Sequence, residues 1–118
     1  MIGKLGLVML MVSDMSRSVA FYRDVLELDV EYESEPWSQV RAGDVSIGLH
    51  HSSEDRSMSQ DGGAELGFYV DDVQTALDTV RERGAEGVQE VKREEWGVLA
   101  VIKDPDGYTI QILELEQH

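Results

Sequence analysis

The sequence predicts an α+β fold in which two βαβββ modules pair to form a curved mixed sheet with a concave cleft and with helices on the outside. The first observation is an internal repeat, because Asp14 and Asp72 stand at equivalent points of two similar segments, 58 residues apart. The second is an alternating strand pattern before each aspartate and a helical spacing of apolar residues after it. The third is a pair of strands joined by a turn that closes each half.

The first module is expected over about residues 1–51. Leu5–Val12 alternates as a half-buried strand does, and Asp14 is placed to cap a helix by accepting an orphan backbone N–H. The helix itself is predicted from apolar residues at helical spacing, which are Met15, Val19, Tyr22, Val25 and Leu26. Three strands then follow, near Val30–Glu33, over Trp37–Arg41 and over Val45–His50.

The second module is expected over about residues 64–118, after a polar linker of about 52–63. Asp72 caps its helix, and Gly84 stands where a left-handed residue ends a helix. Asp104–Gly107 has the composition of a turn, with the glycine at a position of positive φ. Its strands are expected over Glu65–Val70, near Val88–Val91, and over Val98–Lys103 and Tyr108–Leu115. Since neither half could bury its sheet alone, we expect one domain over 1–118.

Composition excludes several partners. The 118 residues contain 10 Lys and Arg against 24 Asp and Glu, which gives a net charge of −14. This charge disfavours nucleic acids and anionic membranes, both of which need clustered cations. The chain has no cysteine, no apolar run of the roughly 20 residues that a membrane span needs, and no recognisable signal peptide. A cytoplasmic location is therefore expected.

Alternation along each strand predicts which side chains line the concave face. If Val8, Leu10 and Val12 meet the helix, the opposite side chains of that strand face the cleft. The same parity applied to the four most regular strands gives Leu7, Met9, Met11, then Ser46, Gly48, His50, then Glu65, Gly67, Tyr69, then Thr109, Gln111, Leu113.

Two predicted hairpin registers add both tryptophans to this face. Pairing Val40 with Val45 places Trp37 opposite Gly48, and it turns Trp37 and Gln39 toward the cleft. Pairing Lys103 with Tyr108 turns a second set toward the cleft, which is Val98, Ala100 and Ile102, with Trp96 just before them. Tryptophan faces stack on planar groups and attract cations. The alternatives are that these side chains belong to the core or to an oligomer interface, and that Gly48 only makes room for the indole ring.

Four segments resemble those of a known superfamily, namely Val12–Asp14, Ser18–Leu26, Phe68–Asp72 and Lys103–Gly107. In combination and order, and over essentially the whole chain, they are similar to the vicinal oxygen chelate superfamily, the glyoxalase/bleomycin-resistance/dioxygenase group. These motifs are structural, so the resemblance implies the fold and leaves the reaction open. Since relatives complete the cleft by dimerising, the resemblance implies a homodimer.

Metal-using members of that superfamily place four ligands on the concave face, typically histidines and glutamates. The corresponding positions by motif register are Leu7, Gly48, Glu65 and Gln111. Leu7 and Gly48 have no donor atom, and two oxygen ligands leave a divalent ion mostly hydrated. Because of this departure from the family's pattern, we expect no cofactor. The alternative is a displaced site of His50, Glu65 and Gln111 that binds Ni, Mn, Fe or Zn.

Three functions follow as hypotheses. The first is a metal-free protein without enzymatic activity that binds a planar or cationic small molecule in an aromatic-walled cleft. The second is a metal-dependent lyase, isomerase or dioxygenase with an atypical site, in which Glu65 is the catalytic candidate. The third is a non-catalytic protein-interaction subunit. Arg41 could meet an anionic ligand, but such an arginine more often pairs with a surface acid. The expected cleft residues are Leu7, Met9, Met11, Trp37, Gln39, Gly48, His50, Glu65, Tyr69, Trp96, Ala100 and Gln111.

Overall fold

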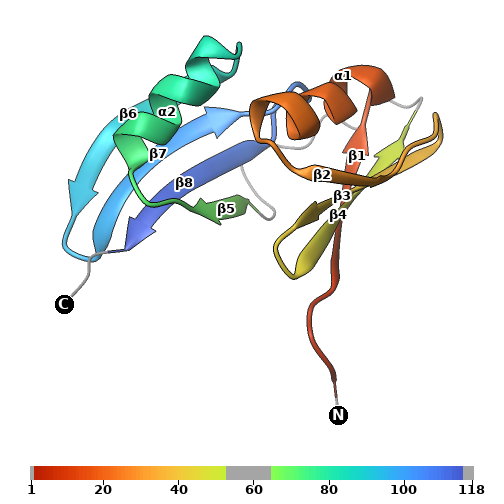
Figure 1. Cartoon of the computed structure of the whole chain (residues 1–118), viewed down its shortest axis with the longest axis horizontal. Helices are drawn as coiled ribbons and strands as arrows, with labels where there is room; N and C mark the ends of the chain where they lie inside the picture. Colours follow the sequence, from red (N-terminus) through yellow and green to blue (C-terminus); the bar gives the residue numbers. More distant parts are fainter. Residues whose placement is uncertain (1, 53–64, 116–118) are drawn as a thin grey trace. The chain divides into compact units, whose positions relative to one another are not determined.

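The computed structural model of the chain describes residues 2–52 and 65–115. The chain divides into two compact units, Met1–Arg56 and Ser57–His118, and each is described by itself (Figure 1). The predicted linker of about 52–63 lies, apart from Ser52, outside the described residues. None of the helices in these two ranges is long and apolar enough to cross a membrane.

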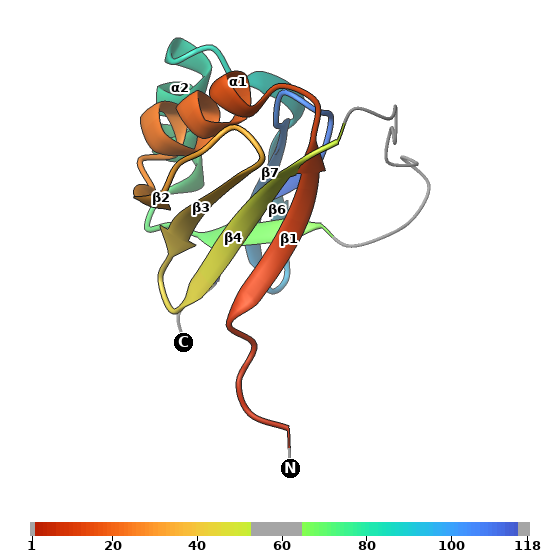
Figure 2. The ribbon, with the colours of Figure 1, turned by 90° about the vertical axis from the view of Figure 1, so that its right-hand side faces the viewer.

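The first unit is a βαβββ module, as the sequence predicts. Its sheet has the order β1-β4-β3-β2, in which β1 and β4 are parallel and the other neighbours are antiparallel (Figure 2). The least regular predicted strand, near Val30–Glu33, is confirmed as β2. The elements are β1 (Leu7–Val12), α1 (Met15–Ala20), η1 (Phe21–Val25), β2 (Asp29–Tyr32), β3 (Trp37–Ala42) and β4 (Val45–His51).

The second unit repeats this arrangement. Its sheet has the order β5-β8-β7-β6, with β5 and β8 parallel and the other neighbours antiparallel. The mixed sheet that the sequence predicts is therefore present as two four-stranded mixed sheets, because the parallel pair of strands forms within each unit. The elements are β5 (Leu66–Tyr69), α2 (Val73–Glu82), β6 (Glu86–Glu94), β7 (Gly97–Lys103) and β8 (Thr109–Leu115).

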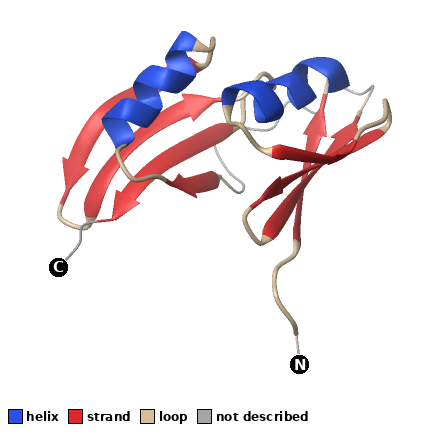
Figure 3. Ribbon diagram, viewed as in Figure 1, coloured by secondary structure: helices blue, strands red, loops and turns tan. Residues whose placement is uncertain are grey.

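In each unit a helical segment packs on one face of the sheet and buries the apolar core there (Figure 3). The helix-facing residues of β1 are confirmed, since Leu10 and Val12 are buried whereas Leu7 and Met9 are exposed. The buried apolar residues of the first unit are Leu10, Val12, Met15, Val19, Phe21, Tyr22, Val25, Val40, Ile47 and Leu49. Those of the second unit are Val73, Leu77, Val80, Val98, Ala100, Ile102, Tyr108, Ile110 and Ile112.

The predicted helix caps are confirmed in both units. A carboxylate oxygen of Asp14 accepts from the backbone N–H of Arg17 at 3.0 Å, and Asp72 accepts in the same way from Thr75 at 3.0 Å. Each bond satisfies one of the donors that a helix N-terminus leaves unpaired. Gly84 ends α2 with a φ of +98°, where a residue with a side chain would be strained.

The first hairpin has a register that differs from the predicted one by two residues. Ala42 pairs with Val45 across a two-residue turn, and Trp37 therefore lies opposite His50 rather than Gly48. The prediction assumed a longer turn, whereas Gly43, with a φ of +64°, allows the tighter one. Because side chains alternate, a shift of two residues keeps every side chain on its predicted face.

The second hairpin differs by one residue, which reverses the faces of β7. Lys103 pairs with Thr109, because the turn also takes in Tyr108. A carboxylate oxygen of Asp104 accepts from the backbone N–H groups of Asp106 and Tyr108, both at 2.9 Å, so the predicted turn chemistry is confirmed. The placement of three side chains toward the cleft is wrong, since Val98, Ala100 and Ile102 are buried against the helix.

Candidate functional site

The face of the first sheet opposite α1, called the first face here, gathers most of the predicted cleft residues. Met9 pairs with Gly48 across β1 and β4, and Gln39 pairs with Gly48 across β3 and β4. Leu7 is 47% exposed and Met9 is 56% exposed, which leaves an apolar strip open on this face. The side chains that share the first face by register are Leu7, Met9, Met11, Trp37, Gln39, Arg41, Ser46, Gly48 and His50.

The ring of Trp37 lies over Gly48. A Cβ atom built on Gly48 would come within 2.5 Å of Trp37 Cζ2, so no larger residue fits there while the ring keeps its place. The interpretation that Gly48 makes room for the ring is therefore confirmed. The imidazole of His50 lies beside it, with ring centroids 6.1 Å apart and planes tilted by 52°. Trp37 thus presents a half-buried aromatic surface on the first face.

A compact turn before β3 fixes the backbone of Trp37. The hydroxyl of Ser34 donates to the carbonyl of Trp37 at 2.6 Å, and the backbone N–H of Trp37 lies 3.3 Å from the same hydroxyl oxygen. The hydroxyl of Ser38 donates to the carbonyl of Ser34 at 3.0 Å. These bonds let the chain enter β3 in one orientation, which positions the indole ring.

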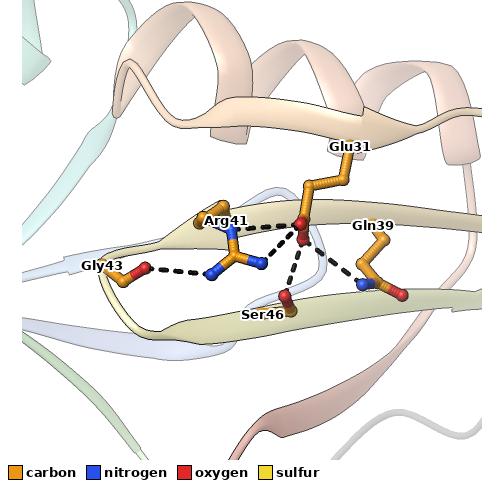
Figure 4. Close-up of polar contacts among 5 residues, drawn as sticks. All are labelled: Glu31, Gln39, Arg41, Gly43 and Ser46. Carbon is orange, nitrogen blue, oxygen red and sulfur yellow. Dashed lines mark hydrogen bonds and ion pairs between the residues drawn. The ribbon is translucent and has the colours of Figure 1, made fainter.

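Glu31 organises the polar part of the first face (Figure 4). Its Oε1 accepts from the hydroxyl of Ser46 at 2.6 Å and from Nε2 of Gln39 at 3.3 Å. Its Oε2 accepts from Nε and Nη2 of Arg41, at 3.1 and 2.9 Å. Arg41 also donates from Nη1 to the carbonyl of Gly43 at 3.4 Å. Arg41 therefore pairs with an acid of the same sheet, as such arginines commonly do.

These donors lower the pKa of Glu31 from its usual 4.5. The largest cause is the hydrogen bond from Ser46, followed by the bond from Gln39, while partial desolvation acts in the opposite direction. Glu31 therefore stays ionised at neutral pH, and its negative charge is compensated locally by Arg41.

Sequence reasoning missed Glu31 because its strand is short and irregular. The pairing of β2 with β3 shifts register between Val30 and Tyr32, and Glu31 lies at this irregularity. Parity along β2 alone cannot place such a residue on a face. The sequence did contain one indication of its role. Arg41 on β3 requires an acidic partner, and Glu31 lies on β2, the strand next to β3.

The face of the second sheet opposite α2, called the second face here, carries the remaining polar candidates. Nε2 of Gln111 donates to Oε2 of Glu65 at 2.6 Å, so the structure brings these two predicted residues together. Tyr69 is 71% exposed. It lies at a hollow of about 830 Å³ whose lining also includes Arg93 and Glu114. Glu65 is joined to this face through its bond to Gln111, and the side chains on the face by register are Gly67, Tyr69, Leu99, Val101, Lys103, Thr109, Gln111 and Leu113.

Two predicted cleft residues do not belong to the second face. Ala100 pairs with Ile112, and both are buried on the face that packs against α2. Trp96 lies in the turn between β6 and β7 and is 47% exposed. The one-residue shift of the second hairpin explains the position of Ala100, whereas Trp96 precedes the paired residues of β7.

The residues at the family's metal-ligand positions do not fit a metal ion. Leu7 and Gly48 offer no donor, and the ring of Trp37 fills the space that a side chain at position 48 would need. Glu65 and Gln111 have oxygens that could bind a metal ion, but the two side chains are hydrogen-bonded to each other. Within residues 2–52 and 65–115, no group of three or more His, Cys, Asp or Glu side chains is arranged to hold a metal. His50 is described with the first unit, whereas Glu65 and Gln111 belong to the second.

Comparison with known proteins agrees with this fold. The family model of the Glyoxalase/Bleomycin resistance protein/Dioxygenase superfamily matches residues 4–112. The chain is 27% identical to a probable lactoylglutathione lyase of Synechocystis, over 90% of this chain and 91% of that one. It is 28% identical to a lactoylglutathione lyase of Salmonella typhimurium, over 90% and 88%.

Among solved structures, TnmS3, an antibiotic binding protein from a Streptomyces species, has a TM-score of 0.81 and 26% identity, with 98% of each chain covered. These relatives are described as lyases in two cases and as a binding protein in the third, so the shared scaffold by itself leaves the choice between a reaction and a binding site open. The chain belongs to the Glyoxalase/Bleomycin resistance protein/Dioxygenase superfamily.

Proposed function

We propose that this chain binds a planar or cationic small molecule on its first face, without a resident metal ion and without catalysing a reaction. The observation that carries the proposal is the placement of Trp37 over Gly48, at a position where metal-using members of the family have a ligand. The aromatic ring replaces the donor there. The site is thereby suited to stacking instead of metal coordination.

The surroundings of Trp37 support this proposal. Leu7 and Met9 leave apolar surface exposed on the same face, and a flat ligand would remove that surface from water. Stacking on an aromatic ring adds about 0.5–1.5 kcal/mol beyond the buried area. The net charge of −14 favours cationic ligands over anionic ones. TnmS3, at 26% identity over 98% of both chains, bears the description of an antibiotic binding protein.

Isothermal titration calorimetry with two planar probes tests the proposal. We expect 9-aminoacridine, a planar cation, to bind more tightly than anthracene-9-carboxylate, a planar anion, and the difference to shrink with added salt. Trp37→Ala should weaken binding of the cation by about tenfold, because the stacking surface is lost. Trp96→Ala is the matched control, since Trp96 lies in a turn of the second unit. Unchanged binding in Trp37→Ala would contradict the proposal.

The competing function is that of a metal-dependent lyase, which the names of the relatives at 27–28% identity favour. It predicts that chelator-treated protein gains a saturable rise in melting temperature with Ni²⁺, Mn²⁺, Fe²⁺ or Zn²⁺. A ligand at 100 times its dissociation constant adds about 2.7 kcal/mol to the free energy of unfolding. If Glu65→Ala abolished such a rise together with lactoylglutathione lyase activity, the enzyme function would replace our proposal.

We also propose that the protein is a cytoplasmic homodimer that binds neither nucleic acid nor membranes. Exposed apolar side chains, Leu7 and Met9 in the first unit and Tyr69 in the second, support association, because apolar surface is costly to leave in water. Sedimentation equilibrium at micromolar concentration should give twice the chain mass of 13.2 kDa. A monomer would contradict the dimer.

A further inference from the structure

The hydrogen bonds of Glu31 determine which end of the Gln39 amide faces outward. An ionised carboxylate can only accept, so Gln39 must present its NH₂ group to Oε1 of Glu31, as it does at 3.3 Å. The amide oxygen of Gln39 is consequently directed away from Glu31 (Figure 4). No interaction of this oxygen exists within the described parts of the chain.

Gln39 is a neighbour of Trp37 on the first face. Trp37 and Gln39 are two residues apart on β3, so their side chains share the first face. Gln39 is the register partner of Gly48, and Gly48 is the residue that the Trp37 ring covers. A ring stacked on Trp37 therefore has the amide oxygen of Gln39 within reach of its edge.

The charged groups nearby are already engaged. Both oxygens of Glu31 accept two hydrogen bonds each, and Arg41 donates two bonds to Glu31 and one to Gly43. A ligand that sought either charge would have to break this network, which has its ionic partners 2.9 Å apart. The free acceptor of Gln39 is a polar group that a ligand can use without such a cost.

We infer that the first face selects planar rings that carry an N–H donor at the edge, and that the amide oxygen of Gln39 accepts from that donor while the ring stacks on Trp37. Glu31 is a positioning residue that acts through Gln39. This inference rests on the proposed binding function and names its ligand class. The overall charge attracts cations at long range, whereas the amide oxygen distinguishes N–H donors at contact.

A matched pair of uncharged probes isolates the donor. Naphthalene-2-carboxamide and methyl naphthalene-2-carboxylate have the same ring system and carbonyl group, but only the amide has N–H donors. Isothermal titration calorimetry of the full chain should show about threefold to tenfold tighter binding of the amide, as one hydrogen bond provides. Gln39→Met should reduce this ratio to about one, since the thioether is a poor acceptor of similar length.

Gln74→Met is the control for the substitution itself. Gln74 also donates its amide to a carboxylate, Asp78, at 3.0 Å, but it lies on α2 of the second unit, so the ratio should remain that of the unaltered chain. Glu31→Gln should lower the ratio without abolishing binding, because a neutral partner no longer fixes the orientation of the Gln39 amide.

The outcomes separate this inference from the proposed function. Equal binding of both probes by the unaltered chain, with loss of both in Trp37→Ala, would overturn the inference and leave the binding function standing. A ratio that survives Gln39→Met would likewise overturn the inference. If neither probe bound while 9-aminoacridine did, the inference alone would fail. If Trp37→Ala bound both probes and 9-aminoacridine as tightly as the unaltered chain does, both proposals would fail.

Discussion

The two units have the same topology but opposite chemistry on corresponding faces. In the first unit, Gly48 pairs with Met9, and Leu7 lies two residues before Met9. In the second unit, Gln111 pairs with Gly67, and Glu65 lies two residues before Gly67. The internal repeat therefore extends to diagonal pairs of side chains. Glu65 and Gln111 are joined by a hydrogen bond of 2.6 Å, whereas Leu7 and Gly48 have no polar atoms to join.

This difference separates the chemistry of the two faces. The second unit has two oxygen-bearing side chains at the equivalent positions, whereas the first unit has no donor there and the ring of Trp37 covers Gly48. Half of a ligand set cannot hold a divalent ion dehydrated. The first face therefore determines the function we propose, and the second face retains polar surface.

The largest expected effect comes from filling the space over Gly48. Gly48→Ala should lower the free energy of unfolding by about 1–3 kcal/mol, because the new Cβ would meet the indole ring of Trp37 and the backbone cannot easily shift in a central strand. Chemical denaturation measures the change. Gly67→Ala is the matched control on the second face, where a Cβ would meet only the end of the Leu113 side chain at 3.1 Å.

A double variant sharpens this prediction. If the cost of Gly48→Ala comes from the ring, it should largely disappear in the background of Trp37→Ala, since the two substitutions act on one contact. Equal costs for Gly48→Ala and Gly67→Ala would show that the Trp37 ring moves aside freely. The contrast between the two faces would then lose its structural basis.

Most of the fold could be predicted from the sequence because its signals are local. The two aspartate caps, the turn at Asp104 and the alternation in β1 each depend on a few neighbouring residues, and all are confirmed. The internal repeat strengthens the prediction, because the same pattern of elements occurs in both halves of the sequence. Local chemistry of this kind is preserved whatever the rest of the chain does.

The candidate site was predicted only in part because it depends on strand register. A two-residue difference in the first hairpin left Trp37 and Gln39 on the correct face, but a one-residue difference in the second moved Ala100 into the core. Register depends on how many residues the turn contains. The turn of the second hairpin contains Tyr108 in addition to Asp104–Gly107, and this shifts the pairing by one residue. Glu31 could not be placed at all, because its strand is irregular there.

A smaller effect concerns the pH dependence of the Glu31 network. Because the folded chain lowers the pKa of Glu31 below 4.5, its ionised form stabilises the fold above that value, and this contribution is lost as the pH falls through the lowered pKa. The difference in free energy of unfolding between the unaltered chain and Glu31→Gln should therefore be largest at neutral pH and shrink below pH 4.5.

Ser46→Ala provides the control for the cause of this shift. The hydroxyl of Ser46 is the main reason for the lowered pKa, so its removal should raise the pKa of Glu31 toward 4.5, as followed by NMR titration of the side-chain carboxyl carbon. If the difference in free energy of unfolding between the unaltered chain and Glu31→Gln grew as the pH fell, the role of the ionised carboxylate would be contradicted. Among residues 65–115, Glu65 of the second face accepts one side-chain hydrogen bond, from Gln111, so we expect this response of the first face.

The smallest effect is expected on the second face. Gln111→Leu removes the hydrogen bond to Glu65, but that carboxylate is exposed and water can replace the lost donor, so the free energy of unfolding should change by no more than about 0.5 kcal/mol. Binding of 9-aminoacridine should also be unchanged, because the stacking surface belongs to Trp37. A loss of more than about 2 kcal/mol would mean that the bond between Gln111 and Glu65 stabilises the fold more than an exposed bond does, and a loss of probe affinity would mean that these residues form part of the site. The two faces would then share the binding function, and the donor-free first face would no longer explain it alone.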